Sequence, residues 1–230
     1  MTEFLEQFIW FPLILTIGAF QVGLFCQKKW KSPVFNPILI GAVLVIGVLL
    51  ITGISPEIYS AGTAGISWLL TPATVCLALP LYEQIQILKK NLPAILAGVT
   101  AGTVTGIVSV ALLCRLFSLD TAISISILPK SITTAMGMVL SQQNGGIPAL
   151  TTTVILATGI LGNLLGYGIC RILKLEDPIS QGVGFGTASH VVGTSRAAEI
   201  SPMACAVSSL SLTVSGILTA VIFPLACRLI

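Results

Sequence analysis

The chain has 230 residues, of which 55% are hydrophobic and only 8% are charged, and its mean hydropathy is +1.02. Soluble domains carry roughly 25% charged residues, so this composition excludes an ordinary soluble protein and predicts an integral membrane protein. The net charge of +3 is small and dispersed, which argues against a nucleic-acid-binding surface. The six cysteines stand singly and the chain has one histidine, so neither a structural metal site nor another cofactor is indicated.

Long apolar stretches follow one another along the whole chain. They cover residues 8–27, 36–54, 61–82, 92–117, 121–143, 147–173, 182–198 and 203–229. About 20 apolar residues are needed for a helix to cross roughly 30 Å of hydrocarbon, so we expect six to eight of these stretches to lie in the bilayer. Because the connections are short, the sequence predicts an all-α polytopic membrane protein whose residues 1–230 form a single membrane domain.

The charged residues give a first indication of topology. Lysines at the end of the first stretch place that end in the cytoplasm and the N-terminus outside, because cytoplasmic loops carry an excess of basic residues. Lys89 and Arg171 both face the cytoplasm only if residues 121–143 enter and leave the bilayer on one side. This favours a re-entrant element broken at Pro129, while two ordinary helices with proline kinks remain the alternative.

A short pattern in one half of the chain recurs in the other half. Thr103, Val104, Gly106 and Ile107 recur 110 residues later as Thr213, Val214, Gly216 and Ile217, with Thr105 opposite Ser215. A proline break is expected before each of these two helices, at Pro93 and at Pro202. Transporters are often built from two such halves, with the substrate bound at mid-membrane where helices are interrupted. The pattern therefore indicates repeat halves 1–117 and 118–230, although chance matches among small apolar residues would give a similar pattern.

The first interrupted stretch contains prolines at Pro72 and Pro80. Proline removes a backbone donor, and a helix that begins at Pro72 would direct its free N–H groups into the gap. Pro72 and Thr74 are therefore candidate substrate-binding residues, and Pro80 is a candidate structural or gating residue. Tyr82 and Glu83 fit better as anchors at the membrane surface.

The second interrupted stretch places a lysine between apolar flanks. A charge inside a membrane is costly unless it faces a cavity or a partner, so Lys130 is a candidate for function. A helix that begins at Pro129 would add backbone donors and hydroxyl groups at the same end, a combination that suits a carboxylate. The candidate substrate-binding residues are Lys130, Ser131, Thr133 and Thr134, and the candidate structural or gating residues are Pro129, Gly145 and Gly146. The alternative is that Lys130 extends to the membrane surface from a helix end.

The third interrupted stretch combines glycines with closely spaced polar residues. On a helix, His190 and Thr194 share a face with Thr187, and Arg196 is placed to pair with Glu199. The candidate substrate-binding residues are Thr187, Ser189, His190 and Thr194, and the candidate structural or gating residues are Gly186, Gly193, Arg196 and Glu199. A tight helix-packing interface would use the same residue types, so packing remains the alternative interpretation.

An enzyme is not indicated. Ser131 adjoins Lys130 and Ser189 adjoins His190, but neighbours in sequence point about 100° apart on a helix and cannot act together as nucleophile and base.

These interrupted stretches resemble the LrgB/CidB family, including its bacterial inner-membrane members. The similar runs are residues 72–84, 128–134, 145–149 and 186–196, and the resemblance extends over essentially the whole chain. Ala135 departs from the family pattern, which often has proline after the paired threonines. The resemblance implies a multi-pass protein of the bacterial inner (cytoplasmic) membrane, with a small LrgA/CidA-type membrane protein as partner.

The resemblance also implies two functions. Some members are described as holin-like or antiholin-like proteins that modulate murein hydrolase activity and lysis, and others transport glycolate, glycerate or pyruvate. The residues favour transport of a small carboxylate, with Lys130 binding the charge, nearby hydroxyls donating hydrogen bonds, and His190 with Thr194 binding a second oxygen or carrying a proton. The expected partners are thus the small membrane protein, the carboxylate and the lipid bilayer, with a homo-oligomer left open and no nucleic acid.

Overall fold

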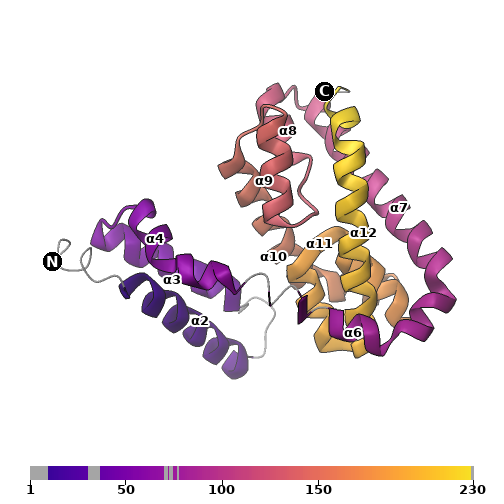
Figure 1. Cartoon of the computed structure of the whole chain (residues 1–230), viewed down its shortest axis with the longest axis horizontal. Coiled ribbons are helices and arrows are strands. Elements are labelled where there is room, and N and C mark those ends of the chain that lie inside the picture. The colour runs from indigo at the N-terminus through magenta and orange to yellow at the C-terminus, as the bar shows by residue number, and fades with distance from the viewer. Residues whose placement is uncertain (1–9, 31–36, 70–71, 73–74, 77, 229–230) are drawn as a thin grey trace. The chain divides into compact units, whose positions relative to one another are not determined.

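The computed structural model describes residues 10–30, 37–69, 72, 75–76 and 78–228. All regular elements within these ranges are helices, which confirms that the protein is all-α (Figure 1). The contacts divide the chain into two compact units, residues 1–76 and 77–230, and each unit is described by itself below.

The described part of the first unit contains three helices. They are α2 (Phe11–Trp30), α3 (Pro37–Thr52) and α4 (Pro56–Trp68), and α2 packs against both of the others. Proline begins α3 and α4, where its missing N–H is not needed. Gly23 allows α2 to approach the first residue of α3, since a Cβ at this position would lie 2.8 Å from the Cα of Pro37. A hydrogen bond of 2.8 Å between the hydroxyls of Thr16 and Tyr59 joins α2 to α4.

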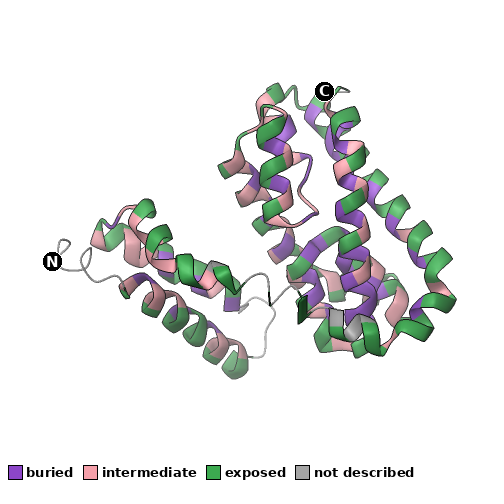
Figure 2. Ribbon diagram, viewed as in Figure 1, coloured by how far each residue is buried: buried purple, intermediate pink, exposed green. Residues whose placement is uncertain are grey.

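The second unit contains the remaining helices. They are α6 (Ala78–Glu83), α7 (Ile85–Leu116), α8 (Thr121–Ile127), α9 (Thr134–Gln143), α10 (Pro148–Ile172), α11 (Pro178–Ile200) and α12 (Pro202–Cys227). The most extensive contact is between α11 and α12, and α7 packs on both of them. Buried residues accordingly gather along α11 and α12 (Figure 2).

Helix length and composition identify the candidate membrane spans. In the described part of the chain, α2, α7, α10 and α12 are long and apolar enough to cross a membrane, and α3 is a shorter apolar helix. Several such helices in one chain are the pattern of a multi-pass membrane protein. The expected proline break before each repeated helix is wrong for α7. Pro202 begins α12, but Pro93 lies inside α7, which already begins at Ile85. Proline is tolerated within membrane helices because neighbouring groups satisfy the freed carbonyls.

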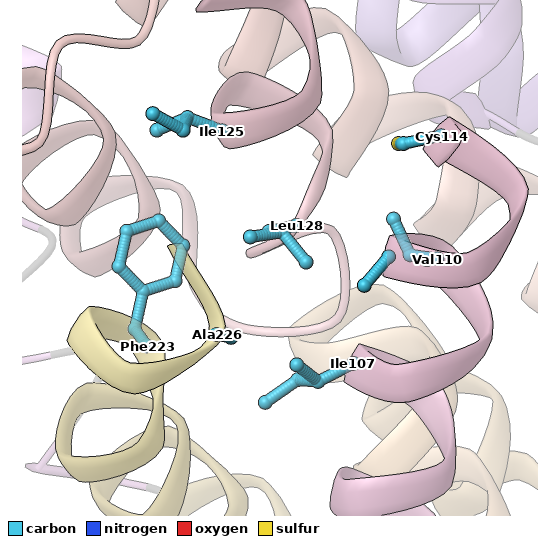
Figure 3. Packing of buried hydrophobic residues seen from close by; sticks show 8 residues of the cluster. Ile107, Val110, Cys114, Ile125, Leu128, Phe223 and Ala226 are labelled. Atoms are coloured by element: carbon cyan, nitrogen blue, oxygen red, sulfur yellow. The ribbon is translucent and has the colours of Figure 1, made fainter. Parts of the chain in front are cut away.

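An apolar cluster joins α7 and α12 to the segment that follows α7. Its buried members are Ile107, Val110, Ala111, Cys114, Ile125, Leu128, Phe223 and Ala226. Figure 3 shows Leu128, just beyond α8, lying between the side chains of α7 and those of α12. This packing fixes the start of the turn that carries Lys130.

Candidate functional site

Helices α8 and α9 and the turn between them, residues 128–133, form a hairpin. Gly137 in the middle of α9 lies beside Pro129, whose carbonyl oxygen is 3.6 Å from the position of a Cβ on Gly137. Further along, the backbone N–H of Ile147 donates to the Ser126 hydroxyl over 2.7 Å. The chain therefore folds back on itself here, with Pro129 beside α9 and Ser126 beside the residue that precedes α10. The two helices are also short, since 7 and 10 residues extend about 10 and 15 Å.

The ends of α9 are set by local hydrogen bonds. Thr133 is the N-cap, because its side chain accepts from the N–H of Met136 over 3.5 Å, so the helix begins at Thr134 and not at Pro129 as the sequence indicated. At the other end, Gly145 has φ of +86°, and the N–H of Gly146 donates to the carbonyl of Ser141 over 2.8 Å. This arrangement is a Schellman motif, in which glycine adopts the left-handed conformation that ends a helix.

Lys130 lies in the turn and is half-buried. Its ammonium group donates to the Ser131 hydroxyl over 3.1 Å. Across the described ranges the one ion pair is between Arg196 and Glu199, so no described carboxylate neutralises Lys130. An ammonium group has three donors, and two of those on Lys130 have no partner among the described residues.

A cavity opens beside Lys130. Its polar lining residues are Lys130, Ser131, Thr103, Thr187, Ser215 and Thr219. They come from the turn and from α7, α11 and α12, and no described carboxylate lies among them. The space between atoms amounts to about 270 Å³, but only about 20 Å³ is wide enough for the centre of a water-sized molecule. The cavity therefore has room for roughly one water molecule.

The hydroxyl groups around the cavity differ in their partners. Thr103 of α7 donates to Ser215 of α12 over 3.0 Å, and both side chains are buried. Thr187 of α11 is only 6% exposed, and its hydroxyl oxygen is buried without a hydrogen-bond partner among the residues that the structure describes. Its methyl group packs on α7, since a Cβ on Gly102 would lie 2.9 Å from it. The cavity therefore combines a cation with donors that lack acceptors.

His190 interrupts α11. Its φ of 44° and ψ of −138° lie outside the helical region, so α11 consists of two helical parts. The ring nitrogen Nε2 hydrogen-bonds to the carbonyl of Ile155 in α10 over 2.8 Å, and the ring packs on Gly159. Thr194 donates to the carbonyl of His190 over 3.0 Å and also shares a hydrogen bond of 2.8 Å with Ser208 of α12. These side chains are thus paired within helix contacts and do not line the cavity beside Lys130.

The rest of the glycine-rich run packs α11 against α10 and α12. Gly186 lies against the carbonyl of Ser208 on α12. Ser189 lies against Gly162 of α10. Beyond the break, Asn163 of α10 donates to the carbonyl of Val192 over 3.2 Å.

The end of α11 is held in two further ways. Arg196 pairs with Glu199, and its guanidinium lies 5.5 Å from the centre of the Tyr167 ring on α10. Gly193 lies against the carbonyl of Phe185 across the break. These contacts are typical of a helix-packing interface.

The structure therefore brings only part of the predicted site together. Pro129, Lys130, Ser131 and Thr187 line the cavity, whereas Thr133, Thr134, Ser189, His190 and Thr194 do not. Pro72 belongs to the first unit and is exposed, Pro80 lies within α6, and Thr74 lies outside the described residues.

Sequence reasoning missed Thr103 and Ser215 as cavity-lining residues. The repeated pattern around Thr103 and Thr213 contains both residues, but by itself it indicates only internal symmetry and not which side chains meet.

Comparisons with known proteins extend over nearly the whole chain. Residues 16–229 match the LrgB-like family. The holin-like protein CidB of Staphylococcus epidermidis is 34% identical over 224 residues, which cover 97% of each chain. The antiholin-like protein LrgB of Bacillus mycoides is 32% identical over 217 residues, 94% of each chain, and protein YxaC of Bacillus subtilis is 34% identical over 213 residues, 93% of each chain. No solved structure matches the chain. Since both the family match and the relatives span almost its full length, the chain belongs to the LrgB-like family.

Proposed function

We propose that this protein carries small monocarboxylates, of the glycolate, glycerate or pyruvate type, across the bacterial cytoplasmic membrane. In this proposal the chain crosses the membrane six to eight times, the hairpin of α8 and α9 is a re-entrant element, and the anion binds beside Lys130. The observation that carries the proposal is the lysine itself, which lies half-buried in an apolar protein and faces a cavity without a described carboxylate partner.

The chemistry of the lining favours an anion. A buried charge is stabilised only by an opposite charge or by hydrogen bonds, and a carboxylate would supply both to Lys130. The other polar groups of the cavity are all hydroxyls, and those of Ser131, Thr187 and Ser215 can donate to carboxylate oxygens. Interrupted helical structure at the binding site is also typical of secondary transporters.

The size of the cavity implies that the described conformation is closed. Space for about one water molecule is too small for a three-atom carboxylate group with its carbon substituent, so the lining must separate before an acid can enter. A carrier passes through such closed conformations, because its site opens to one side of the membrane at a time.

Uptake into proteoliposomes tests the proposal. We expect labelled glycolate or pyruvate to accumulate in vesicles that contain the native chain, and Lys130→Ala to abolish this uptake. Lys89→Ala, which removes an exposed lysine at the start of α7, is the matched control and should retain uptake. Equal loss of uptake in both variants, with both proteins folded, would count against the site. Each measurement is repeated with the small LrgA/CidA-type membrane protein, the proposed partner.

The second candidate function is a holin-like or antiholin-like role in the control of murein hydrolase activity and lysis. It is favoured by the names of two relatives, one a holin-like protein CidB and the other an antiholin-like protein LrgB. The same vesicles separate the two candidates. Leakage of unrelated solutes without selective acid uptake would favour a pore, and binding to the small partner or to a hydrolase with neither flux would favour a regulator.

A further inference from the structure

Thr187 differs from several other helical threonines of the second unit in the use of its hydroxyl. Thr151, Thr194 and Thr213 each donate to the backbone carbonyl four residues earlier, at distances of 3.2, 3.0 and 2.9 Å. This local bond is the usual way in which a threonine satisfies its hydroxyl within a helix. Thr187 makes no such bond, although its hydroxyl oxygen is buried. Its donor is therefore available to something other than its own helix.

The packing of the methyl group explains this orientation. The Cγ2 atom of Thr187 lies against Gly102 of α7, where any larger residue would collide with it. Because Cγ2 and the hydroxyl diverge from the same Cβ, the contact with α7 fixes which rotamer the side chain adopts. Thr187 lines the cavity that Lys130 also lines. An unpaired buried hydroxyl is unfavourable, so a group that enters the cavity and accepts from it would be bound.

A second donor faces the same space. Thr103 donates to Ser215, which leaves the hydrogen of the Ser215 hydroxyl without an acceptor among the described residues. Ser215 is 1% exposed and also lines the cavity. The side walls thus offer neutral donors on Thr187 of α11 and on Ser215 of α12, beside the hydroxyl of Thr219 on α12, in addition to the charge on Lys130. A ligand that satisfies Thr187 and Ser215 as well as Lys130 must carry oxygen atoms beyond those that bind the ammonium group.

We propose that Thr187, assisted by Ser215, is the residue that determines specificity for an oxygen on the carbon next to the carboxylate. The proposal rests on the proposed function, in which Lys130 binds the carboxylate itself. A hydroxyl or keto oxygen at this carbon accepts from Thr187, whereas an acid that lacks it leaves the donor unpaired. The site therefore discriminates 2-hydroxy and 2-oxo acids from simple acids of the same length. This assigns to Thr187 a task that the sequence alone had assigned to His190 and Thr194.

Binding of glycolate and acetate to the purified full chain in detergent tests this assignment, because the two acids differ by one hydroxyl. The native protein should prefer glycolate by about tenfold, the effect expected for one net hydrogen bond. Thr187→Val removes the hydroxyl, keeps the shape and should abolish the preference by weakening glycolate only. Thr187→Ser keeps the hydroxyl and should retain the preference. Thr153→Val, which removes an exposed hydroxyl on α10, is the control and should change neither affinity.

Several outcomes would overturn the assignment. If Thr187→Val weakens both acids equally, the side chain serves packing on Gly102, and if the preference survives in Thr187→Val, another group reads the hydroxyl. Should Thr187→Val fail to fold, Ser215→Ala takes its place and should reduce the preference for glycolate. An unchanged preference in Ser215→Ala would then overturn the assignment. Equal binding of the two acids by the native protein, still lost in Lys130→Ala, overturns the assignment but leaves the proposed function. Binding of neither acid overturns both.

Discussion

Two places where the second unit departs from helical structure, the break in α11 and the turn of residues 128–133, differ in how well their polar groups are paired. At the break in α11, the His190 ring bonds to the carbonyl of Ile155, and Thr194 shares a hydrogen bond with Ser208. At the turn of residues 128–133, the Ser131 hydroxyl is the only hydrogen-bond partner of the Lys130 side chain within the described part of the chain. The same residue types thus serve packing in one place and remain available for a ligand in the other. In an apolar chain, it is the absence of a partner, more than polarity, that marks a binding group.

The largest effect is expected where α11 packs on α12. Gly186→Val would place a side chain against the carbonyl of Ser208, with the Cβ already 2.8 Å from that of Ser211. We expect it to destabilise the folded protein by about 3 kcal/mol or more, the upper range for overpacking. Gly184→Val on the same helix meets nothing within 4 Å and is the matched control. Unfolding in detergent by titrated denaturant measures both. Similar stabilities for the two variants would show that the glycine-rich run does not act in packing.

A smaller loss of folding stability is expected at the break in α11. His190→Ala leaves the buried carbonyl of Ile155 without its partner, which should cost about 2–3 kcal/mol. His190→Gly loses the same hydrogen bond but relieves the positive φ, so it should be more stable than His190→Ala by about 1 kcal/mol. In a regular helix the alanine variant would instead be the more stable of the two. The same denaturant titration decides it, and an alanine variant more stable than the glycine variant would mean that α11 is continuous.

Substitution at Gly106 tests a residue of the cavity wall, in contrast to the helix-packing residues above. Gly106 lines the cavity, and a Cβ at this position meets nothing within 4 Å. Gly106→Ala should therefore stabilise α7 by about 0.5–1 kcal/mol through its higher helix propensity. The added methyl group would occupy space that the acid needs, so glycolate binding should fall. Unfolding and binding assays on one preparation test whether stability rises while glycolate affinity falls. A variant in which both stability and affinity fall would indicate a structural role of the cavity.

The smallest effect is expected at Asp177, the N-cap of α11. Its carboxylate accepts from the backbone N–H of Ser180 over 2.9 Å, and this hydrogen bond lowers the pKa of Asp177 below its usual value. A lowered pKa stabilises the fold at pH values above the ordinary pKa of aspartate, and the contribution is lost as the pH falls through the lowered value. Asp177→Ala should cost about 0.5 kcal/mol at neutral pH, because the side chain is exposed and screened by water.

The control for Asp177 is a variant that keeps the cap without the charge. Asp177→Asn retains an oxygen acceptor and should lose less stability than Asp177→Ala at neutral pH. Thermal unfolding at neutral pH and well below pH 4 should show the difference between native protein and Asp177→Ala only at neutral pH. A difference that persists unchanged in acid would mean that the charge of Asp177 is not involved.

Much of the fold follows from local signals in the sequence. Pro148, Pro178 and Pro202 each stand at the first position of a helix, and Gly145 ends α9, as their conformational preferences require. The sequence also predicted a break near Pro129. It could not locate the break in α11, which falls on His190 and not on a glycine, because the hydrogen bond that stabilises it comes from a distant helix.

The candidate site was predictable only in part. Lys130 stands out because a charge in an apolar run is visible in sequence alone. Thr103 and Ser215 meet through the packing of α7 on α12, and no local pattern states which faces of two helices will touch. The distinction between Thr187 and Thr194 is likewise a matter of rotamer and neighbours, since both are helical threonines with the same intrinsic chemistry.

The hydrogen bonds of α10 indicate which part of the cavity lining is held most firmly. Near its start, α10 is tied to the hairpin by the bond from Ile147 to Ser126 and by a 2.7 Å bond from Thr151 to Ser141. Moving the hairpin away from α10 would therefore break two bonds, at about 0.5–1.5 kcal/mol each. By contrast, α7 is joined to the cavity lining by one described side-chain hydrogen bond, from Thr103 to Ser215, and by the apolar cluster in which it packs against Leu128. If the proposed site opens, displacing α7 therefore breaks fewer hydrogen bonds than displacing the hairpin, but it also exposes the apolar side chains that hold the start of the lysine-bearing turn.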